Sequence, residues 1–184
     1  MTEHDILDLI RSDPWMMRVL AAAQQMHLPD WMIGAGFVRN KVWDHLHGFH
    51  NAVVPTADID LVYFDPSDTS EETEKRLDEI LHHTLDVAWS CKNEARMHTI
   101  NEFPPFTSST DAISKWPETA TAVGVTRDGD MLHLIAPHGI NDLVEMIVRP
   151  TPAFAATEKN KRKVFERMNQ KGWITKWPRL RIDL

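Results

Sequence analysis

The spacing of hydrophobic residues changes repeatedly along the chain, and each spacing predicts a different secondary structure. Apolar residues three and four positions apart predict amphipathic helices, and these lie at 13–26, 37–46, 70–84 and 158–171. Short runs rich in β-branched and aromatic residues predict strands, and these lie at 31–33, 59–64 and 85–92. An Asp-Gly pair, Asp128 and Gly129, stands between two further apolar segments at 119–125 and 131–136 and predicts a hairpin.

Residues at the helix ends sharpen several of these boundaries. Asp13 is suited to the N-cap of the first helix, with Pro14 in its first turn. Thr69 and Glu72 have the spacing of a capping box at the start of the third helix. Two further segments are less regular, and a helix is favoured for both, at 93–101 and 140–148.

The order of these elements indicates the class of the fold. Helices and strands alternate in the first half, and a hairpin and further helices follow. That order is typical of an α/β or α+β domain with a mixed central β-sheet and helices mainly on one side. At 184 residues the chain fits one domain. Its expected parts are N-terminal helices at about 1–28, a sheet core at about 29–136 and a C-terminal helical part at about 137–184.

Composition narrows the class of protein. The apolar, charged and aromatic shares of 42%, 26% and 8% are those of an ordinary globular protein. The longest apolar runs are too short to span a bilayer, and the acidic, polar start of the chain argues against a signal peptide. A single cysteine, Cys91, excludes an internal disulfide. These features predict a cytoplasmic protein without a membrane partner.

Charge is distributed unevenly along the chain. The formal net charge of −7 argues against a general nucleic-acid binder. From Glu158 onward, however, Lys and Arg are frequent, and a basic segment on an acidic body could meet a polyphosphate or a nucleic acid. The alternative is a solvated helix face that pairs with acidic residues of the same chain. For Trp173 and Trp177 in this segment, anchoring the segment to the body is favoured over stacking on bases.

The chemistry that the sequence offers is concentrated at 31–65. Gly34 and Gly36 follow a predicted strand and precede a predicted helix, where the backbone can approach a ligand closely and free N–H groups can bind phosphates. Asp58 and Asp60 share one face of the next strand, because alternate side chains of a strand point the same way. Two close carboxylates suit Mg²⁺, which binds one or two carboxylates together with substrate phosphates. A nucleoside triphosphate (NTP) with its metal would satisfy both parts, and in-line attack at phosphorus would be the reaction.

These motifs resemble those of a known superfamily. The segments IGAGFVRN at 33–40 and ADIDL at 57–61 are similar to the signature of the DNA polymerase beta-type nucleotidyltransferases, in particular to the version found in tRNA nucleotidyltransferases. The wider chain, including KNEARMH at 92–98 and the pair Trp177-Pro178, resembles an uncharacterised bacterial family of nucleotidyltransferase-like proteins. The resemblance implies an enzyme that transfers a nucleoside monophosphate from an NTP to an acceptor. It leaves open whether the acceptor is a small molecule, a protein or RNA.

The resemblance also implies roles for individual residues. Asp58 and Asp60 would bind Mg²⁺ or Mn²⁺, and Arg39 would support the glycine-rich turn or touch a phosphate. Three residues of that turn would hold the triphosphate: Gly34, Ala35 and Gly36. Asn40 departs from the pattern, because the tRNA enzymes have an acid there. This departure puts the tRNA-specific subtype in doubt.

The superfamily usually has a third carboxylate on a neighbouring strand, often as the general base. Two acids bracket the strand predicted at 85–92: Asp86 near its start and Glu94 just past its end. Glu94 is favoured, because Lys92 and Arg96 flank it and would suit a site that binds phosphates. If neither acid completes the site, the chain would be a non-catalytic nucleotide-binding or regulatory module with the same fold.

Other kinds of site are not supported by the sequence. A Walker-type Gly-Lys-Ser/Thr motif is absent, which excludes a P-loop enzyme. Haloacid-dehalogenase-type phosphatases place Asp-x-Asp after a hydrophobic strand, whereas here the hydrophobic strand follows the pair. The spacing of His45, His47 and His50 matches no zinc-binding pattern, and these histidines are expected to be solvated or to cap a helix.

Overall fold

Five strands form the central sheet, in the order β3-β2-β1-β4-β5. The computed structural model describes residues 1–49 and 58–183, so that His50 and Ala57 lie outside the described residues. The strands are β1 (Met32–Gly34), β2 (Ile59–Tyr63), β3 (Trp89–Asn93), β4 (Gly124–Asp128) and β5 (Met131–Ile135). β2 and β3 are parallel, whereas β1 is antiparallel to both β2 and β4, and β4 is antiparallel to β5. The sheet is therefore mixed, as the sequence predicts.

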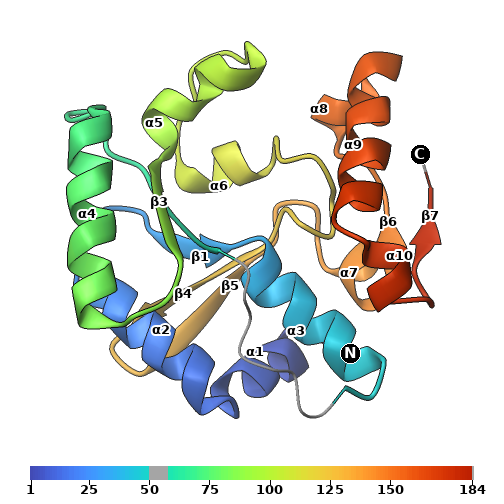
Figure 1. Ribbon diagram of the computed structural model, residues 1–184, viewed down its shortest axis with the longest axis horizontal. Helices are drawn as coiled ribbons and strands as arrows, with labels where there is room; N and C mark the ends of the chain where they lie inside the picture. The colour runs from blue at the N-terminus through green and yellow to red at the C-terminus, as the bar shows by residue number, and fades with distance from the viewer. Residues whose placement is uncertain (50–57, 184) are drawn as a thin grey trace.

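Three N-terminal helices cover one face of this sheet (Figure 1). They are α1 (Glu3–Arg11), α2 (Pro14–Gln24) and α3 (Gly36–Leu46). Alternate strand residues such as Ile33, Leu61 and Val125 are fully buried and belong to the main hydrophobic core together with apolar residues of these helices. Burial of this apolar surface is the main stabilising contribution to such a fold. The predicted fold class, with helices mainly on one side of a mixed sheet, is confirmed.

The opposite face of the sheet is covered differently. Met32 and Val62 point to this face and form a small apolar cluster with α6 (Ser109–Ile113). Asp60 shares the face with Val62, since the two are alternate residues of β2, and it lies beside Ser90 in the parallel pair of β2 and β3. Polar residues are thus placed beside a small apolar cluster, on the side of the sheet away from α1–α3.

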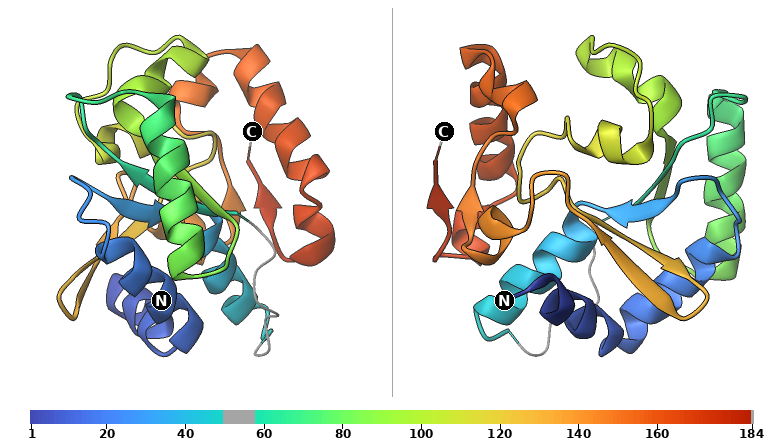
Figure 2. Two further views of the ribbon diagram at one scale, coloured as in Figure 1. Left: turned by 60° about the vertical axis from the view of Figure 1, so that its left-hand side comes forward. Right: turned by 180° about the vertical axis from the view of Figure 1, so that it is seen from behind.

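The four helices predicted from hydrophobic spacing are confirmed. They correspond to α2, α3, α4 (Glu71–Thr84) and α9 (Glu158–Gln170). Asp13 caps α2, because its Oδ1 accepts hydrogen bonds from the backbone N–H groups of Trp15 and Met16 at 2.9 and 3.2 Å. α4 lies against β3 and provides the crossover that a parallel pair of strands requires (Figure 2). Within residues 1–49 and 58–183, every helix is too short or too polar to cross a membrane.

The N-terminus of α4 differs from the prediction. Ser70 is its N-cap, and the Oγ of Ser70 accepts a hydrogen bond from the N–H of Thr73 at 3.3 Å. Asp68 fixes this arrangement, because its carboxylate accepts hydrogen bonds from the N–H of Ser70 at 3.0 Å and from the Thr73 hydroxyl at 2.7 Å. The capping box predicted for Thr69 and Glu72 is therefore wrong.

Two predicted strands are shorter than expected. β3 begins at Trp89 instead of residue 85, because residues 85–89 form short-range backbone hydrogen bonds typical of a turn. The first strand of the hairpin begins at Gly124 instead of residue 119, because the N–H of Thr119 donates to the carbonyl of Arg149 at 2.9 Å, outside the hairpin. The hairpin itself is confirmed, and Gly129 has the positive φ, 55°, that its turn requires.

Two predicted helices are also shorter than expected. At 93–101 a short α-helix is followed by one turn of 3₁₀-helix. At 140–148 the helix ends early, because Met146 has a φ of 57°, which an α-helix does not accommodate. The elements found are α5 (Glu94–Met97), the 3₁₀-helix (His98–Asn101) and α7 (Asn141–Val144).

The C-terminal part packs against α3. Its remaining elements are β6 (Ile147–Val148), α8 (Pro152–Ala155), α10 (Trp173–Lys176) and β7 (Arg181–Ile182), and β6 pairs in parallel with β7. Trp173 and Trp177 are buried and meet Trp43 of α3 edge to face, with ring centroids 5.5 and 5.1 Å apart. The indole N–H of Trp177 also donates to Asp44 Oδ1 at 2.7 Å. The prediction that both tryptophans anchor this segment to the body is confirmed.

Candidate active site

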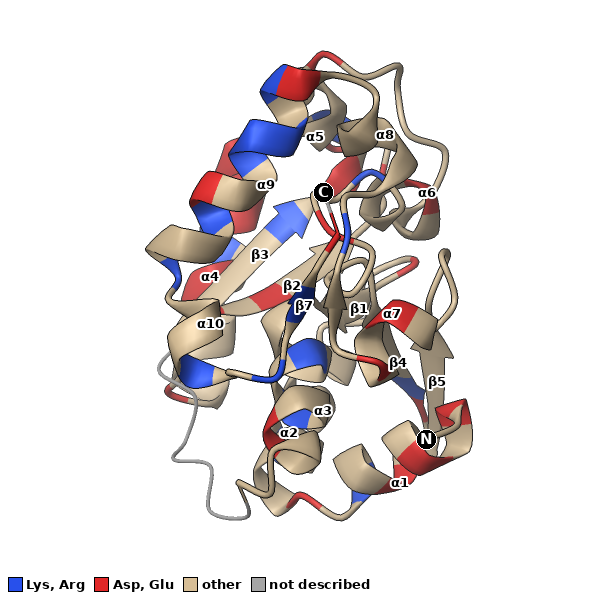
Figure 3. Ribbon diagram, turned by 90° about the vertical axis from the view of Figure 1, so that its right-hand side faces the viewer, with Lys and Arg blue, Asp and Glu red and all other residues tan. Residues whose placement is uncertain are grey.

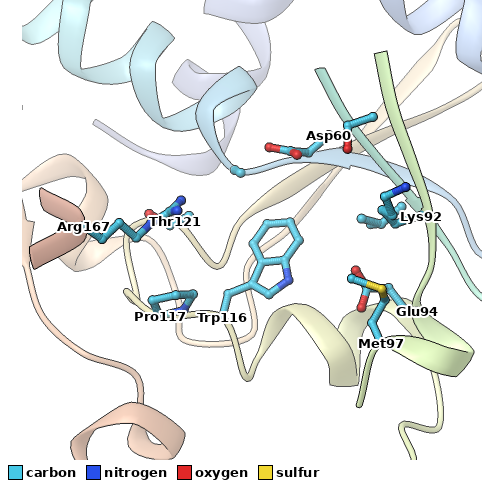
Figure 4. Close-up of a pocket in the computed structure, with 11 residues that line it drawn as sticks. Asp60, Lys92, Glu94, Met97, Trp116, Pro117, Thr121 and Arg167 are labelled. Carbon is cyan, nitrogen blue, oxygen red and sulfur yellow. The ribbon is translucent and has the colours of Figure 1, made fainter. Parts of the chain in front are cut away.

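A cavity of about 200 Å³ lies against the face of the sheet that α1–α3 leave uncovered (Figure 4). β2 contributes Asp60 and Val62 to its lining, and β3 contributes Ser90 and Lys92. These four residues share a face because Asp60 pairs with Ser90, and Val62 with Lys92, in the register of the two parallel strands. The other lining residues come from several distant parts of the chain: Ala35, Glu94, Met97, Trp116, Pro117, Thr121 and Arg167.

The two aspartates predicted to bind metal lie at the start of β2. Asp58 is exposed and directly precedes the strand, whereas Asp60 is partly buried in the cavity wall. Burial raises the pKa of Asp60, and the negative charge of Asp58 raises it further. The positive charges of Arg167, Lys171 and Arg39 act in the opposite direction. The pair therefore holds negative charge that a cation would stabilise.

Glu94 is the second carboxylate in the lining of the cavity, together with Asp60, whereas Asp58 is not among the lining residues. Glu94 is the first residue of α5, directly after β3, and only 4% of it is exposed. Burial raises the pKa of Glu94 from 4.5 to about 7, with further contributions from the negative charges of Glu74 and Asp60. Asp86, the alternative third acid, is exposed, and its Oδ1 lies 3.3 Å from His82 Nε2. It is not among the residues that line the cavity, because β3 begins three residues after it.

The carboxylates fit part of the coordination shell of a hard divalent cation. Among residues 1–49 and 58–183, no group of three or more His, Cys, Asp or Glu side chains is arranged closely enough to hold a metal ion. Mg²⁺, however, commonly binds through one or two carboxylates and completes its shell with water and substrate phosphates. Asp58 and Asp60 are oxygen donors of that kind, placed on one side of β2.

The glycine-rich turn joins β1 to α3 at the edge of the cavity. Gly34 has no room for a side chain, because a Cβ there would lie 2.5 Å from Trp116 Cη2 and 2.9 Å from its Cζ3. Ala35 is the N-cap of α3 with a φ of 53° and a ψ of −121°, a strained conformation for any residue except glycine. A Cβ at Gly36 would lie 3.1 Å from Asn40 Nδ2, a close but softer contact. The turn thus contacts Trp116 on one side, and the methyl group of Ala35 cannot cap the first N–H groups of α3.

Arg39 of α3 contacts Thr121 and the C-terminal segment. Its side chain is buried, and its guanidinium lies 4.2 Å from the ring centroid of Trp173 and 5.3 Å from that of Trp43. It donates hydrogen bonds to Thr121 Oγ1 at 2.7 Å and to Asn40 Oδ1 at 2.9 Å. Burial lowers the pKa of Arg39 to about 10. Arg39 is not among the residues that line the cavity.

The two cations that flank Glu94 are placed differently. Lys92 lines the cavity, and its Nζ lies 3.2 Å from Glu74 Oε2. Arg96 is not among the lining residues, since its guanidinium donates to Glu74 at 2.8 and 2.6 Å and to Glu71 at 3.2 Å. The structure therefore brings Lys92 to the cavity and engages Arg96 with acids of α4.

Trp116 and Arg167 are among the lining residues that the sequence does not assign to the site. Trp116 stands in the middle of the cavity, with Arg167 on one side and Glu94 on the other (Figure 4). Arg167 extends into the cavity from α9, which carries a series of Lys and Arg residues (Figure 3). The basic composition after Glu158 is the signal that points to Arg167, although it does not distinguish this residue from its neighbours.

The chain is similar to known proteins in sequence and in fold. A family model described as "Nucleotidyltransferase" matches residues 21–182. A solved structure described as "The NMR structure of the protein reveals a CCA-adding enzyme head domain" superposes with a TM-score of 0.86 at 33% identity, over 99% of this chain and 96% of that chain. A structure described as "Structure of tRNA-processing enzyme with CTP" gives a TM-score of 0.46 at 17% identity, over 86% of this chain and 48% of its own. No curated protein matches the chain.

Proposed function

The chain belongs to the nucleotidyltransferase family whose model it matches over residues 21–182, and from this membership we propose that it transfers a nucleoside monophosphate from an NTP to an acceptor. One observation carries the proposal. Asp60 and Glu94 line the same cavity. The negative charge of Asp58 acts on Asp60, and the negative charges of Glu74 and Asp60 act on Glu94. A pair of carboxylates for a divalent cation and a third acid with a pKa of about 7 are what this reaction needs.

Each residue has a role in the proposed reaction. Asp58 and Asp60 would hold Mg²⁺ or Mn²⁺, which neutralises phosphate charge when bound. Lys92 and the first N–H groups of α3, in the turn formed by residues 34–36, would bind phosphate oxygens. Glu94 would accept the proton of the acceptor hydroxyl while the acceptor oxygen forms a bond to the α-phosphorus. The bond between that phosphorus and the β-phosphate oxygen breaks, and pyrophosphate leaves.

Three classes of acceptor are compatible with the proposed reaction: a small molecule, a protein and RNA. The 33% identity to a structure described as a CCA-adding enzyme head domain makes an RNA end one of the acceptors to test first. Asn40, which replaces the acid found in the tRNA enzymes, is a reason to test the other two classes in parallel.

The metal and nucleotide site can be tested by binding alone. The double variant Asp58→Asn with Asp60→Asn keeps the size of both side chains and removes both charges. Calorimetric titration with a nonhydrolysable NTP analogue should show metal-dependent binding to the parent and none to the variant. Asp86→Asn is the matched control, because that carboxylate is exposed and outside the cavity lining. Equal metal-dependent binding by the parent and the double variant would show that the site is elsewhere.

A non-catalytic nucleotide-binding or regulatory module is the second candidate. It is favoured by the burial of Glu94, because burial raises the pKa of this carboxyl group and so stabilises the protonated form, which cannot accept a proton. Incubation with labelled NTPs and a panel of small alcohols, proteins and RNAs separates the two functions. Incorporation of label that disappears in Glu94→Gln would support transfer, whereas NTP binding without incorporation into any class of acceptor would support the module.

A further inference from the structure

A buried group of charged residues closes the side of the cavity away from Glu94. Glu118 is fully buried, and its Oε1 lies 3.3 Å from Arg167 Nε. Among the described residues, neither oxygen of Glu118 nor the Nε of Arg167 has a hydrogen-bond partner in good geometry. An arginine that faces a buried carboxylate through Nε keeps its Nη1 and Nη2 groups for another anion. Those two groups, and not the acceptor oxygens of Glu118, are what an anionic ligand would bind.

The charges of this group do not balance. Within the group, two guanidinium groups, those of Arg39 and Arg167, face the one carboxylate of Glu118. The next carboxylate that both arginines act on is that of Asp60, on β2. Arg39 is enclosed between aromatic rings and donates to Thr121 and Asn40. Arg167 has a side chain that is 36% exposed and lines the cavity. The excess positive charge is thus presented to the cavity through Arg167.

The opposite part of the cavity carries negative charge. Asp60 and Glu94 lie there, and Asp58 adds its charge to that of Asp60. The carboxylate of Asp60 and the guanidinium of Arg167 both point into the cavity, from β2 and from α9 (Figure 4). A ligand with a metal ion at one end and unneutralised phosphates at the other would match this separation of charge.

We propose that Arg167 binds the terminal phosphates of the nucleotide and that Glu118 positions its guanidinium for this contact. The proposal rests on the proposed function and adds a residue from the C-terminal helix to the site. Guanidinium binds phosphate oxygens in a bidentate manner, which a lysine cannot reproduce. Glu118 contacts Nε, which leaves two further nitrogens of Arg167 to bind the phosphates.

The test compares ligands that share a nucleoside and differ in their phosphates. Binding of a nonhydrolysable NTP analogue and of the corresponding monophosphate is measured by calorimetry in the presence of Mg²⁺. The affinity of the weaker ligand is obtained from a titration in which the tighter ligand displaces it. Arg167→Ala should weaken NTP binding by about 10- to 100-fold, the usual effect of a lost charged hydrogen bond. It should leave monophosphate binding unchanged. Arg167→Lys should give an intermediate loss, and it keeps the charge if the alanine variant folds poorly.

Two further variants separate the possible explanations. Arg162→Ala removes an arginine that is exposed on the same helix, and NTP binding should not change. Glu118→Gln should lower the ratio of NTP affinity to monophosphate affinity. Adding Arg167→Ala to Glu118→Gln should change that ratio little further. A Glu118 that merely supports the fold would change the unfolding temperature and leave the ratio as it is.

The outcomes distinguish this inference from the proposed function. If the parent binds no NTP, both fail. If the parent binds NTP through Asp58 and Asp60, and Arg167→Ala binds NTP as tightly as the parent, only the role of Arg167 is refuted. An equal loss for NTP and monophosphate also refutes it, because the terminal phosphates would then not be the groups recognised.

Discussion

Glu94 should make the stability of the protein depend on pH in a specific direction. Its pKa in the folded protein is about 7, against 4.5 for an ordinary glutamate, because the side chain is buried near Glu74 and Asp60. A group with a raised pKa binds its proton more tightly in the folded state than in the unfolded chain. The free energy of unfolding therefore falls as the pH rises from about 4.5 to 7, where the folded protein must give up that proton.

The size of the effect follows from the shift. Each pKa unit corresponds to about 1.4 kcal/mol, so a rise from 4.5 to about 7 gives a loss of about 3 kcal/mol, most of it between pH 5 and 8. Glu94→Gln removes the titrating group and keeps the shape of the side chain. Relative to this variant, the parent should become less stable by about that amount over the same pH range.

Urea denaturation at several pH values measures this difference directly. The control is Glu79→Gln, which changes an exposed glutamate of α4 and should leave the pH dependence as in the parent. If the parent and Glu94→Gln lose stability in parallel between pH 5 and 8, the argument from burial is wrong. If Glu94 is also the general base, the transfer rate should rise with pH through about 7, since only the ionised carboxylate accepts a proton.

Two further predictions concern the turn before α3. Gly34→Ala places a Cβ 2.5 Å from Trp116, so chemical denaturation should show a free energy of unfolding lower by about 1 to 3 kcal/mol, as for other overpacked sites. In a chain that already carries Trp116→Ala, Gly34→Ala should cost much less. Equal costs in the two chains would contradict the contact. Ala35→Gly should instead raise the free energy of unfolding by about 1 kcal/mol. Ala35 has a φ of 53°, and strain of this kind costs about 1 to 3 kcal/mol. Part of the gain from relieving it is lost because glycine has more conformational entropy in the unfolded chain. A thermal unfolding temperature that falls in Ala35→Gly would contradict the strain.

The parts of the site that sequence predicts well are those set by local periodicity. Gly34 ends β1 and Gly36 begins α3, and Asp60 alternates with buried neighbours of β2. The sequence also contains an unused signal for α1. Thr2 and Asp5 form a capping box, and the buried residues Ile6 and Ile10 are one helical turn apart.

The remaining parts were not readable from residue patterns. The sequence favours Glu94 over Asp86 through its flanking cations, but residue preferences do not predict the turn at 85–89 that delays the start of β3. Arg167 lies on α9, and α10, which follows it, packs against Trp43, more than a hundred residues earlier. No pattern of hydrophobic spacing encodes such a contact.

The position of α3 has a consequence for how this chain can tolerate insertions. Its N-terminus forms the turn at the cavity, and Trp43 and Asp44 near its other end hold Trp177. An added residue within α3 would rotate everything after it by about 100° and advance it by about 1.5 Å. Trp43 would then face away from the C-terminal segment while the turn stayed in place. Single-residue insertions between 37 and 42 should therefore separate Arg167 from the acidic side of the cavity, although neither Arg167 nor the acidic residues are changed.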